Sequence, residues 1–287
     1  MAAIIGQGFF SSGAVHVALA VGATVALVSG SVGVFAVIRG QSFAGEALSD
    51  VGATGASAAF LVGAQPLWGL LSAAVGAAAV MELIGIQRPR GRDLATGIVL
   101  GASLGVAALF LYLDATYHST TGATVTILFG SLFAIDPSTL PAIVALSLVA
   151  LVLVVLIHRP LLLSSLNADM AAARGIPVRA VGALYLLALA VAVSLSALTI
   201  GAILGTALLV GPAATALRLT RRPSAAMLAA AGIGVAATWL GIVLAYDSFY
   251  WPPHGHGWPV SFFIVALILA LYLLAGLPGL RRARRAG

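Results

Sequence analysis

Two carboxylates, Glu46 and Asp50, interrupt a stretch that otherwise has the composition of a membrane-spanning helix. Residues four apart share one face of an α-helix, separated by roughly 6 Å of helical rise. An ionisable group at membrane depth costs at least ~2.5–3.5 kcal/mol, so such groups usually face a bundle interior and carry ions, protons or substrate. Two carboxylates on one face repel each other unless a cation or a shared proton lies between them. The pair therefore predicts a cation-binding step on a translocation path. The alternative is that the carboxylates bond to backbone or helix ends, with Glu46 reaching the interface.

The composition around this pair is that of a polytopic membrane protein. Of 287 residues, 61% are hydrophobic and 8% are charged, a balance that predicts an all-α integral membrane protein. We expect a single transmembrane domain over residues 1–287. The net charge is +6, but the arginines form short clusters between apolar runs without interleaved aromatics, which argues against a nucleic-acid partner. The chain has no cysteine, so disulfides and thiolate metal sites are excluded.

Hydropathy predicts about nine transmembrane helices, one short re-entrant helix and one short cytoplasmic coupling helix. Residues 123–135 are too few to cross a ~30 Å hydrocarbon core, which indicates a half-helix. The nine predicted spans cover about residues 16–38, 42–62, 67–86, 94–113, 140–157, 178–198, 200–217, 225–246 and 260–277.

Charge segregation predicts the orientation of these spans. If nine spans alternate from an outside N-terminus, every arginine falls on one side, including those of the basic tail 278–287. The opposite side then holds aspartates and histidines in its loops. Basic residues mark cytoplasmic loops, so we expect the N-terminus outside and the C-terminus in the cytoplasm.

The cytoplasmic loop 161–177 contains the features of a short capped helix. Asn167 can cap its N-terminus, Asp169 falls in its first turn and Arg174 in its last, and Gly175 ends it. Nothing in the membrane requires such a helix. We interpret it as a docking element for a cytoplasmic partner, with a plain connector as the alternative.

The external loop 251–259 contains two histidines, His254 and His256, in a stretch rich in tryptophan, proline and glycine. Two imidazoles in such a stiff loop could capture a divalent ion before it enters the membrane. His-x-His alone is a weak pattern. An interfacial loop anchored by aromatics, or a docking surface for an external partner, are the alternatives.

Five motifs in order resemble the membrane subunit of the zinc/manganese family of ABC transporters. Residues 45–50 read Gly-Glu-Ala-Leu-Ser-Asp and are similar to the family's Gly-Asp-Ala-Leu-Ser-His motif. The others are residues 90–98 (Arg-Gly-Arg-Asp-Leu-Ala-Thr-Gly-Ile), 128–132 (Leu-Phe-Gly-Ser-Leu), 171–178 (Ala-Ala-Ala-Arg-Gly-Ile-Pro-Val) and 207–216 (Ala-Leu-Leu-Val-Gly-Pro-Ala-Ala-Thr-Ala).

This resemblance implies a permease of the bacterial cytoplasmic membrane that imports manganese or zinc. It implies a homodimer with a second copy of the chain, a cytoplasmic ATP-binding subunit and an external metal-binding protein. The permease would not itself be an enzyme or need a cofactor, because ATP is bound and hydrolysed by the partner. Glu46 and Asp50 stand where the family has Asp and His. At position 50 oxygen therefore replaces nitrogen, which favours manganese or iron relative to zinc.

Two other functions fit the composition. One is a related ABC permease for iron chelates or cobalamin, in which a carboxylate pair has no clear role. The other is a gradient-driven secondary metal ion transporter, which internal inverted repeats would support. The sequence has no Gly-x-x-x-x-Gly-Lys loop and no lysine, so the energy for active transport must come from an ion gradient or from another subunit.

Overall fold

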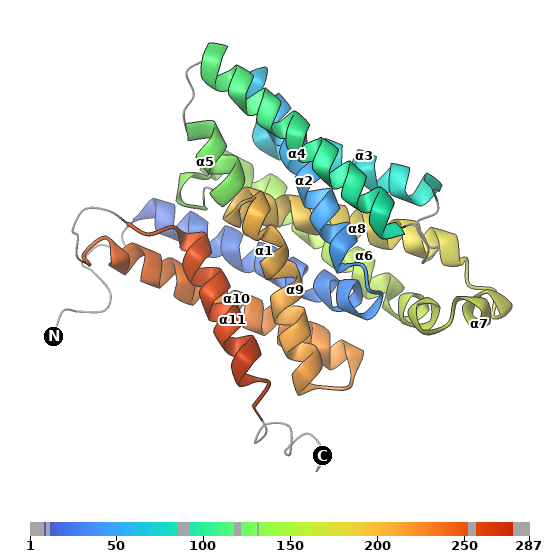
Figure 1. Ribbon diagram of the computed structural model, residues 1–287. Helices are drawn as coiled ribbons and strands as arrows, with labels where there is room; N and C mark the ends of the chain where they lie inside the picture. Colours follow the sequence, from blue (N-terminus) through green and yellow to red (C-terminus); the bar gives the residue numbers. More distant parts are fainter. Residues whose placement is uncertain are drawn as a thin grey trace.

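The computed structural model describes residue 9 and residues 12–84, 92–117, 122–130, 132–251 and 257–277. The regular structure within these ranges is entirely helical (Figure 1). The elements are α1 (Gly13–Ile38), α2 (Ser42–Leu61), α3 (Pro66–Ile84), α4 (Arg92–Tyr117), α5 (Gly122–Phe129), the 3₁₀ turns η2 (Leu132–Ala134) and η3 (Pro137–Thr139), α6 (Leu140–Leu166), α7 (Ala168–Ala173), α8 (Val178–Ile200), α9 (Ala202–Leu219), α10 (Pro223–Ser248) and α11 (Val260–Leu274).

Each predicted span falls on one of these helices. Seven of the helices in the described ranges are long and apolar enough to cross a membrane, namely α1, α3, α4, α6, α8, α9 and α10. Helix α2 has the length, but its two carboxylates and its many glycine, serine and threonine residues lower its hydropathy. Helix α11 is apolar but has 15 residues. The fold is therefore a membrane helix bundle, and the count of nine spans stays a prediction.

Helices α1 and α8 form the centre of the bundle. Helix α1 packs against α6, α8, α9 and α10, and its second half is buried almost without interruption. Phe35 of α1 and Tyr185 of α8 are among the largest fully buried side chains, and their rings meet edge to face at 6.4 Å. Of the candidate spans in the described residues these two are the most buried, with 72% of the apolar window of α1 and 78% of that of α8 inside the bundle.

Helices α2, α3 and α4 form a second group, drawn along the upper edge of Figure 1. Helices α2 and α3 cross where Gly55 faces Gly69, so closely that a methyl group on either glycine would overlap the other's carbonyl oxygen. Small residues at such crossings let membrane helices approach closely. This packing holds the carboxylate-bearing helix α2 against its neighbours.

Residues 123–135 do not form a spanning helix, as predicted. Helix α5 has 8 residues and stops at Gly130, whose φ of +80° is accessible chiefly to glycine. The backbone of Gly130 lies against Gly201, the break between α8 and α9, where φ is +92°. A side chain at either position would strike the other segment's backbone.

The fifth predicted span ends later than expected. Helix α6 continues through Pro160 to Leu166, whereas the sequence predicted an end near residue 157 and a loop from residue 161. Proline removes one backbone hydrogen bond but does not always end a membrane helix, because other groups can satisfy the freed carbonyl. The connection from α6 to α8 therefore begins at Asn167, and residues 161–166 belong to α6.

A capped turn precedes the N-terminal end of α6. The Asp136 carboxylate accepts a hydrogen bond of 2.8 Å from the backbone N–H of Ser138, which starts the 3₁₀ turn that leads into the helix. This hydrogen bond holds the pKa of Asp136 below its usual value.

Candidate metal translocation site

Helix α2 places Glu46 and Asp50 one turn apart, as the sequence predicted. The chain enters α2 directly from α1, through Gly40 at φ +62°, and the Gly45 N–H already bonds the Gln41 carbonyl at 3.1 Å. Glu46 therefore lies in the second turn of the helix. It is half-buried, whereas Asp50 is only 5% exposed.

Glu46 lines a cavity of about 800 Å³ between α2, α9 and α11. The same lining contains three hydroxyl groups, from Ser42, Thr206 and Tyr272. The other lining residues are apolar or small. The donors gathered here are oxygens, which suit manganese and other hard or borderline divalent ions.

Tyr272 is held in this lining by Arg218. The Arg218 guanidinium carbon lies 3.5 Å from the centre of the Tyr272 ring, and Nη1 donates to the Tyr272 carbonyl at 3.2 Å. Nη2 donates to the Tyr272 hydroxyl. This contact fixes the end of α11 against the end of α9, beside the cavity.

Asp50 lies among packed helices. The Thr54 hydroxyl, one turn further along α2, donates to the carbonyls of Asp50 (3.1 Å) and of Ser103 in α4 (2.7 Å). Ser49 donates to the Ala202 carbonyl at the start of α9, at 3.3 Å. Asp50 is thus held where α2 meets both α4 and α9.

Across the part of the chain that the structure describes, no group of three or more histidine, cysteine, aspartate or glutamate residues could hold a metal ion.

The predicted cytoplasmic helix is present as α7. Asn167 Oδ1 accepts a hydrogen bond from the Met170 N–H at 2.9 Å, which is the predicted N-cap. Asp169 lies in the first turn. Arg174 is the residue just after the last turn rather than within it, and Gly175 at φ +76° reverses the chain. The helix packs against α6 and α8.

The loop between α10 and α11, which we predicted to be external, is anchored by aromatic residues at both ends. The Trp251 indole N–H donates to the Asp247 carboxylate at 3.0 Å, and the backbone N–H of Trp258 donates to Ser248 Oγ at 2.9 Å. The Trp251 and Trp258 rings meet edge to face at 6.4 Å. His254 and His256 lie outside the described residues, so the metal-capture hypothesis stays a prediction.

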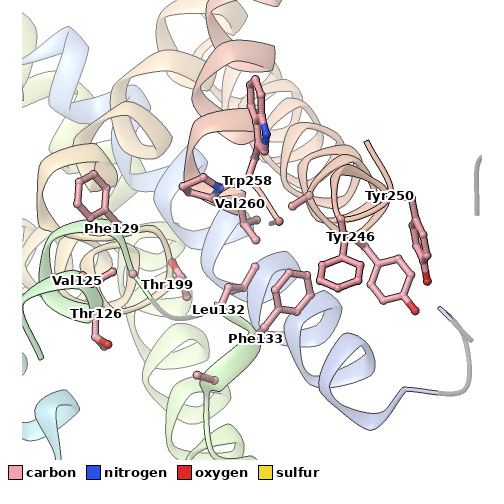
Figure 2. A pocket seen from close by; sticks show the side chains of 16 residues that line it. Val125, Thr126, Phe129, Leu132, Phe133, Thr199, Tyr246, Tyr250, Trp258 and Val260 are labelled. Carbon is pink, nitrogen blue, oxygen red and sulfur yellow. The ribbon is translucent and has the colours of Figure 1, made fainter. Parts of the chain in front are cut away.

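This loop borders a second cavity, of about 890 Å³. Figure 2 shows aromatic side chains around it, contributed by α5, by the turn that follows, by α10 and by the loop before α11. Its labelled aromatic residues are Phe129, Phe133, Tyr246, Tyr250 and Trp258. Among the described residues, its lining is mostly aromatic and apolar, with hydroxyl groups from Thr126, Thr199, Tyr246 and Tyr250.

Three residues at this site, Thr206, Tyr272 and Arg218, were not predicted from the sequence. Thr206 and Tyr272 lie far from Glu46 in the sequence and join it in the lining because α9 packs against α2 and α11 packs against α9. Arg218 acts there through its contacts with Tyr272. The sequence offered one weak indication of this lining, because Tyr272 is a polar residue inside the otherwise apolar span 260–277.

The family model of the ABC 3 transport family matches residues 12–275. The chain belongs to this family. The manganese transport system membrane protein MntC of Listeria innocua is 30% identical to it, over 84% of each chain. The manganese import system permease protein ScaB of Streptococcus parasanguinis is 30% identical, over 84% of this chain and 83% of its own.

A solved structure is also similar. PsaBC from Streptococcus pneumoniae, in complex with Fab, matches with a TM-score of 0.81 and 25% sequence identity, covering 96% of both chains. Family, relatives and fold confirm the resemblance to ABC-type membrane subunits that the five motifs predicted. The relatives are named as membrane or permease components, and neither name describes an enzyme.

Proposed function

We propose that this chain is the membrane permease subunit of an ATP-driven importer for a divalent transition metal ion, with manganese as the favoured cargo. The observation that carries the proposal is the carboxylate pair on α2, one member of which lines a largely apolar cavity together with the hydroxyl groups of Ser42, Thr206 and Tyr272. The relatives are named for manganese transport and import, which supports a metal ion rather than a bulky chelate as the cargo.

In this mechanism the ion leaves an external binding protein and enters the cavity beside α2. Glu46 and Asp50 neutralise its charge and so lower the cost of holding a divalent ion at membrane depth. Hydroxyl oxygens from Thr206 and Tyr272, water, and a second copy of the chain facing the same cavity complete the coordination. The ion leaves on the cytoplasmic side when the transporter resets.

The energy is supplied by a separate cytoplasmic ATP-binding subunit, which we place against α7. Five of the six residues of this helix are exposed, and its remaining residue, Ala171, is buried against the bundle. The helix is therefore packed against the bundle and exposes a face on which such a subunit could dock.

The test is metal accumulation in cells that lack their own uptake system. Cells would express this chain with and without its ATP-binding subunit and receive manganese and zinc in parallel. We expect accumulation that requires the ATP-binding subunit, and we expect Glu46→Ala with Asp50→Ala to reduce it to background while the complex still assembles. Asp136→Asn is the matched control, because asparagine keeps the cap on an exposed site remote from the cavity.

Each contrary result has a distinct meaning. Normal uptake in the double variant would overturn the site. Uptake without the ATP-binding subunit would indicate a secondary carrier. An assembled complex that accumulates neither metal would favour a chelate permease.

A further inference from the structure

Arg39 lies at the junction between α1 and α2. It is the residue that follows the last turn of α1, and the chain then reverses within two residues. The Gln41 N–H donates back to the Ala36 carbonyl at 2.8 Å and the Gly40 N–H donates to the Val37 carbonyl at 3.2 Å, a closure typical of a helix that ends in glycine. Because α2 starts at the next residue, any displacement of this junction is passed directly to the helix that carries the carboxylate pair.

The Arg39 side chain bonds to both sides of this junction. Its Nε donates to Gln41 Oε1 at 3.1 Å, on the α2 side. Its Nη1 donates to the hydroxyls of Ser164 (3.3 Å) and Ser165 (3.2 Å). These serines belong to the last turn of α6, immediately before Asn167 caps α7.

The Arg39 guanidinium also contacts α8, the helix that follows α7 in the sequence. It lies 5.6 Å from the centre of the Tyr185 ring of α8, a cation–π distance. Tyr185 is fully buried and its hydroxyl donates to the Val32 carbonyl of α1 at 3.3 Å. Helix α8 starts just after α7, so Arg39 contacts both helices that flank α7 as well as the start of α2.

We propose that Arg39 is a positioning residue that transmits movement of α7 to α2, and thereby couples the ATP-binding subunit to the carboxylate pair. This inference rests on the proposed function, because it requires that subunit to act on α7. A planar guanidinium can bond to Gln41 and the two serines while stacking on Tyr185, whereas the ammonium of lysine has neither the fork geometry nor the flat face.

A purely structural role would have a different signature. An arginine that only stabilised the end of α1 would change the folding and yield of the complex, but not the amount of metal moved per ATP hydrolysed. The coupling ratio is therefore the decisive quantity, and it must be measured on assembled complexes.

The experiment uses the full permease with its ATP-binding subunit in proteoliposomes, with manganese as the probe. Uptake and ATP hydrolysis are measured in the same vesicles for Arg39→Ala, Arg39→Lys and the double variant Ser164→Ala, Ser165→Ala. We expect Arg39→Ala to lower manganese transported per ATP by roughly 2- to 30-fold, the range seen for residues that carry coupling. Arg39→Lys should recover part of the loss. Arg159→Ala is the matched control, since Arg159 is exposed on α6 about one and a half turns before the serines.

A combined variant tests whether the serines and Arg39 act together. If they do, adding the two serine substitutions to Arg39→Ala lowers the ratio no further, whereas additive losses would overturn the serine link. A wild-type ratio in assembled Arg39→Ala complexes would overturn the proposal. If Arg39→Ala fails to assemble, Arg39→Lys and the serine variant decide, and unchanged ratios in both overturn it. Failure of wild-type complexes to take up manganese or zinc would instead overturn the proposed function.

Discussion

At the residue scale, the two carboxylates of α2 have different surroundings. Glu46 is half-buried and reaches the cavity shared with α9 and α11, whereas Asp50 is enclosed where α2 meets α4 and α9. Their shared helix face could be predicted from a spacing of four residues, because that spacing is a local property of the chain. The oxygen donors opposite Glu46 could not be predicted in this way, since they come from helices remote in the sequence. The role of both carboxylates in transport stays a prediction.

The identity of residue 50 should set the preference between metals. Replacing Asp50 by histidine exchanges an oxygen donor for a nitrogen donor, and nitrogen favours zinc relative to manganese. We expect the manganese-to-zinc uptake ratio to fall by about tenfold, which corresponds to ~1.4 kcal/mol of differential binding. The measurement is uptake of radiolabelled manganese in competition with zinc.

Asp50→Asn is the control for this exchange, because it retains an oxygen donor of the same size but removes the charge. It should weaken uptake of both metals without reversing their order. An unchanged metal ratio in Asp50→His would show that residue 50 does not touch the ion.

At the element scale, helix ends were harder to predict than helix identity. The N-cap of α7 and the half-helix character of α5 follow from local chemistry, an asparagine side chain and a short apolar run, and both are confirmed. The extension of α6 through Pro160 was missed. Proline usually ends a helix in water, but in a membrane bundle other groups can satisfy the backbone carbonyl that it leaves without a donor. The final turn of α6 is also held by its packing and by the hydrogen bonds from Arg39.

The crossing of α2 and α3 should be sensitive to a single methyl group. Gly55→Ala places its side chain against the backbone of Gly69, so the two helices must separate, and overpacking of this kind costs about 1–3 kcal/mol. We expect a lower thermal unfolding midpoint for the purified protein in detergent. Uptake should fall as well, because α2 carries the carboxylate pair.

Gly76→Ala, on the partner helix α3 and away from the crossing, provides the comparison. Nothing lies within 4 Å of the position its methyl group would take, and alanine is the better helix former by ~1 kcal/mol. Its unfolding midpoint should equal or exceed that of the wild type. A Gly55→Ala protein as stable as Gly76→Ala would mean that the close crossing is not maintained in the membrane.

At the scale of the whole molecule, the sequence pattern predicted a list of helices but not their neighbours. The contacts of α5 with the α8–α9 break, and of Arg39 with three separate helices, depend on positive-φ glycines and hydrogen bonds between residues more than one hundred positions apart. Hydropathy describes how apolar each segment is and does not indicate which segments contact each other. The orientation in the membrane is different, because it follows from charge alone and can be predicted without any knowledge of packing.

That orientation can be tested directly because the chain contains no cysteine. Single cysteines at Ser138, exposed before α6, and at Ala172, exposed on α7, would lie on opposite sides of the membrane in the predicted topology. A membrane-impermeant maleimide added to intact cells should label Ser138→Cys, and should label Ala172→Cys only after the membrane is opened. The reverse pattern would place α7 outside the cell, where no ATP-binding subunit could reach it. It would therefore overturn the orientation, and with it the coupling role that we propose for α7 and Arg39.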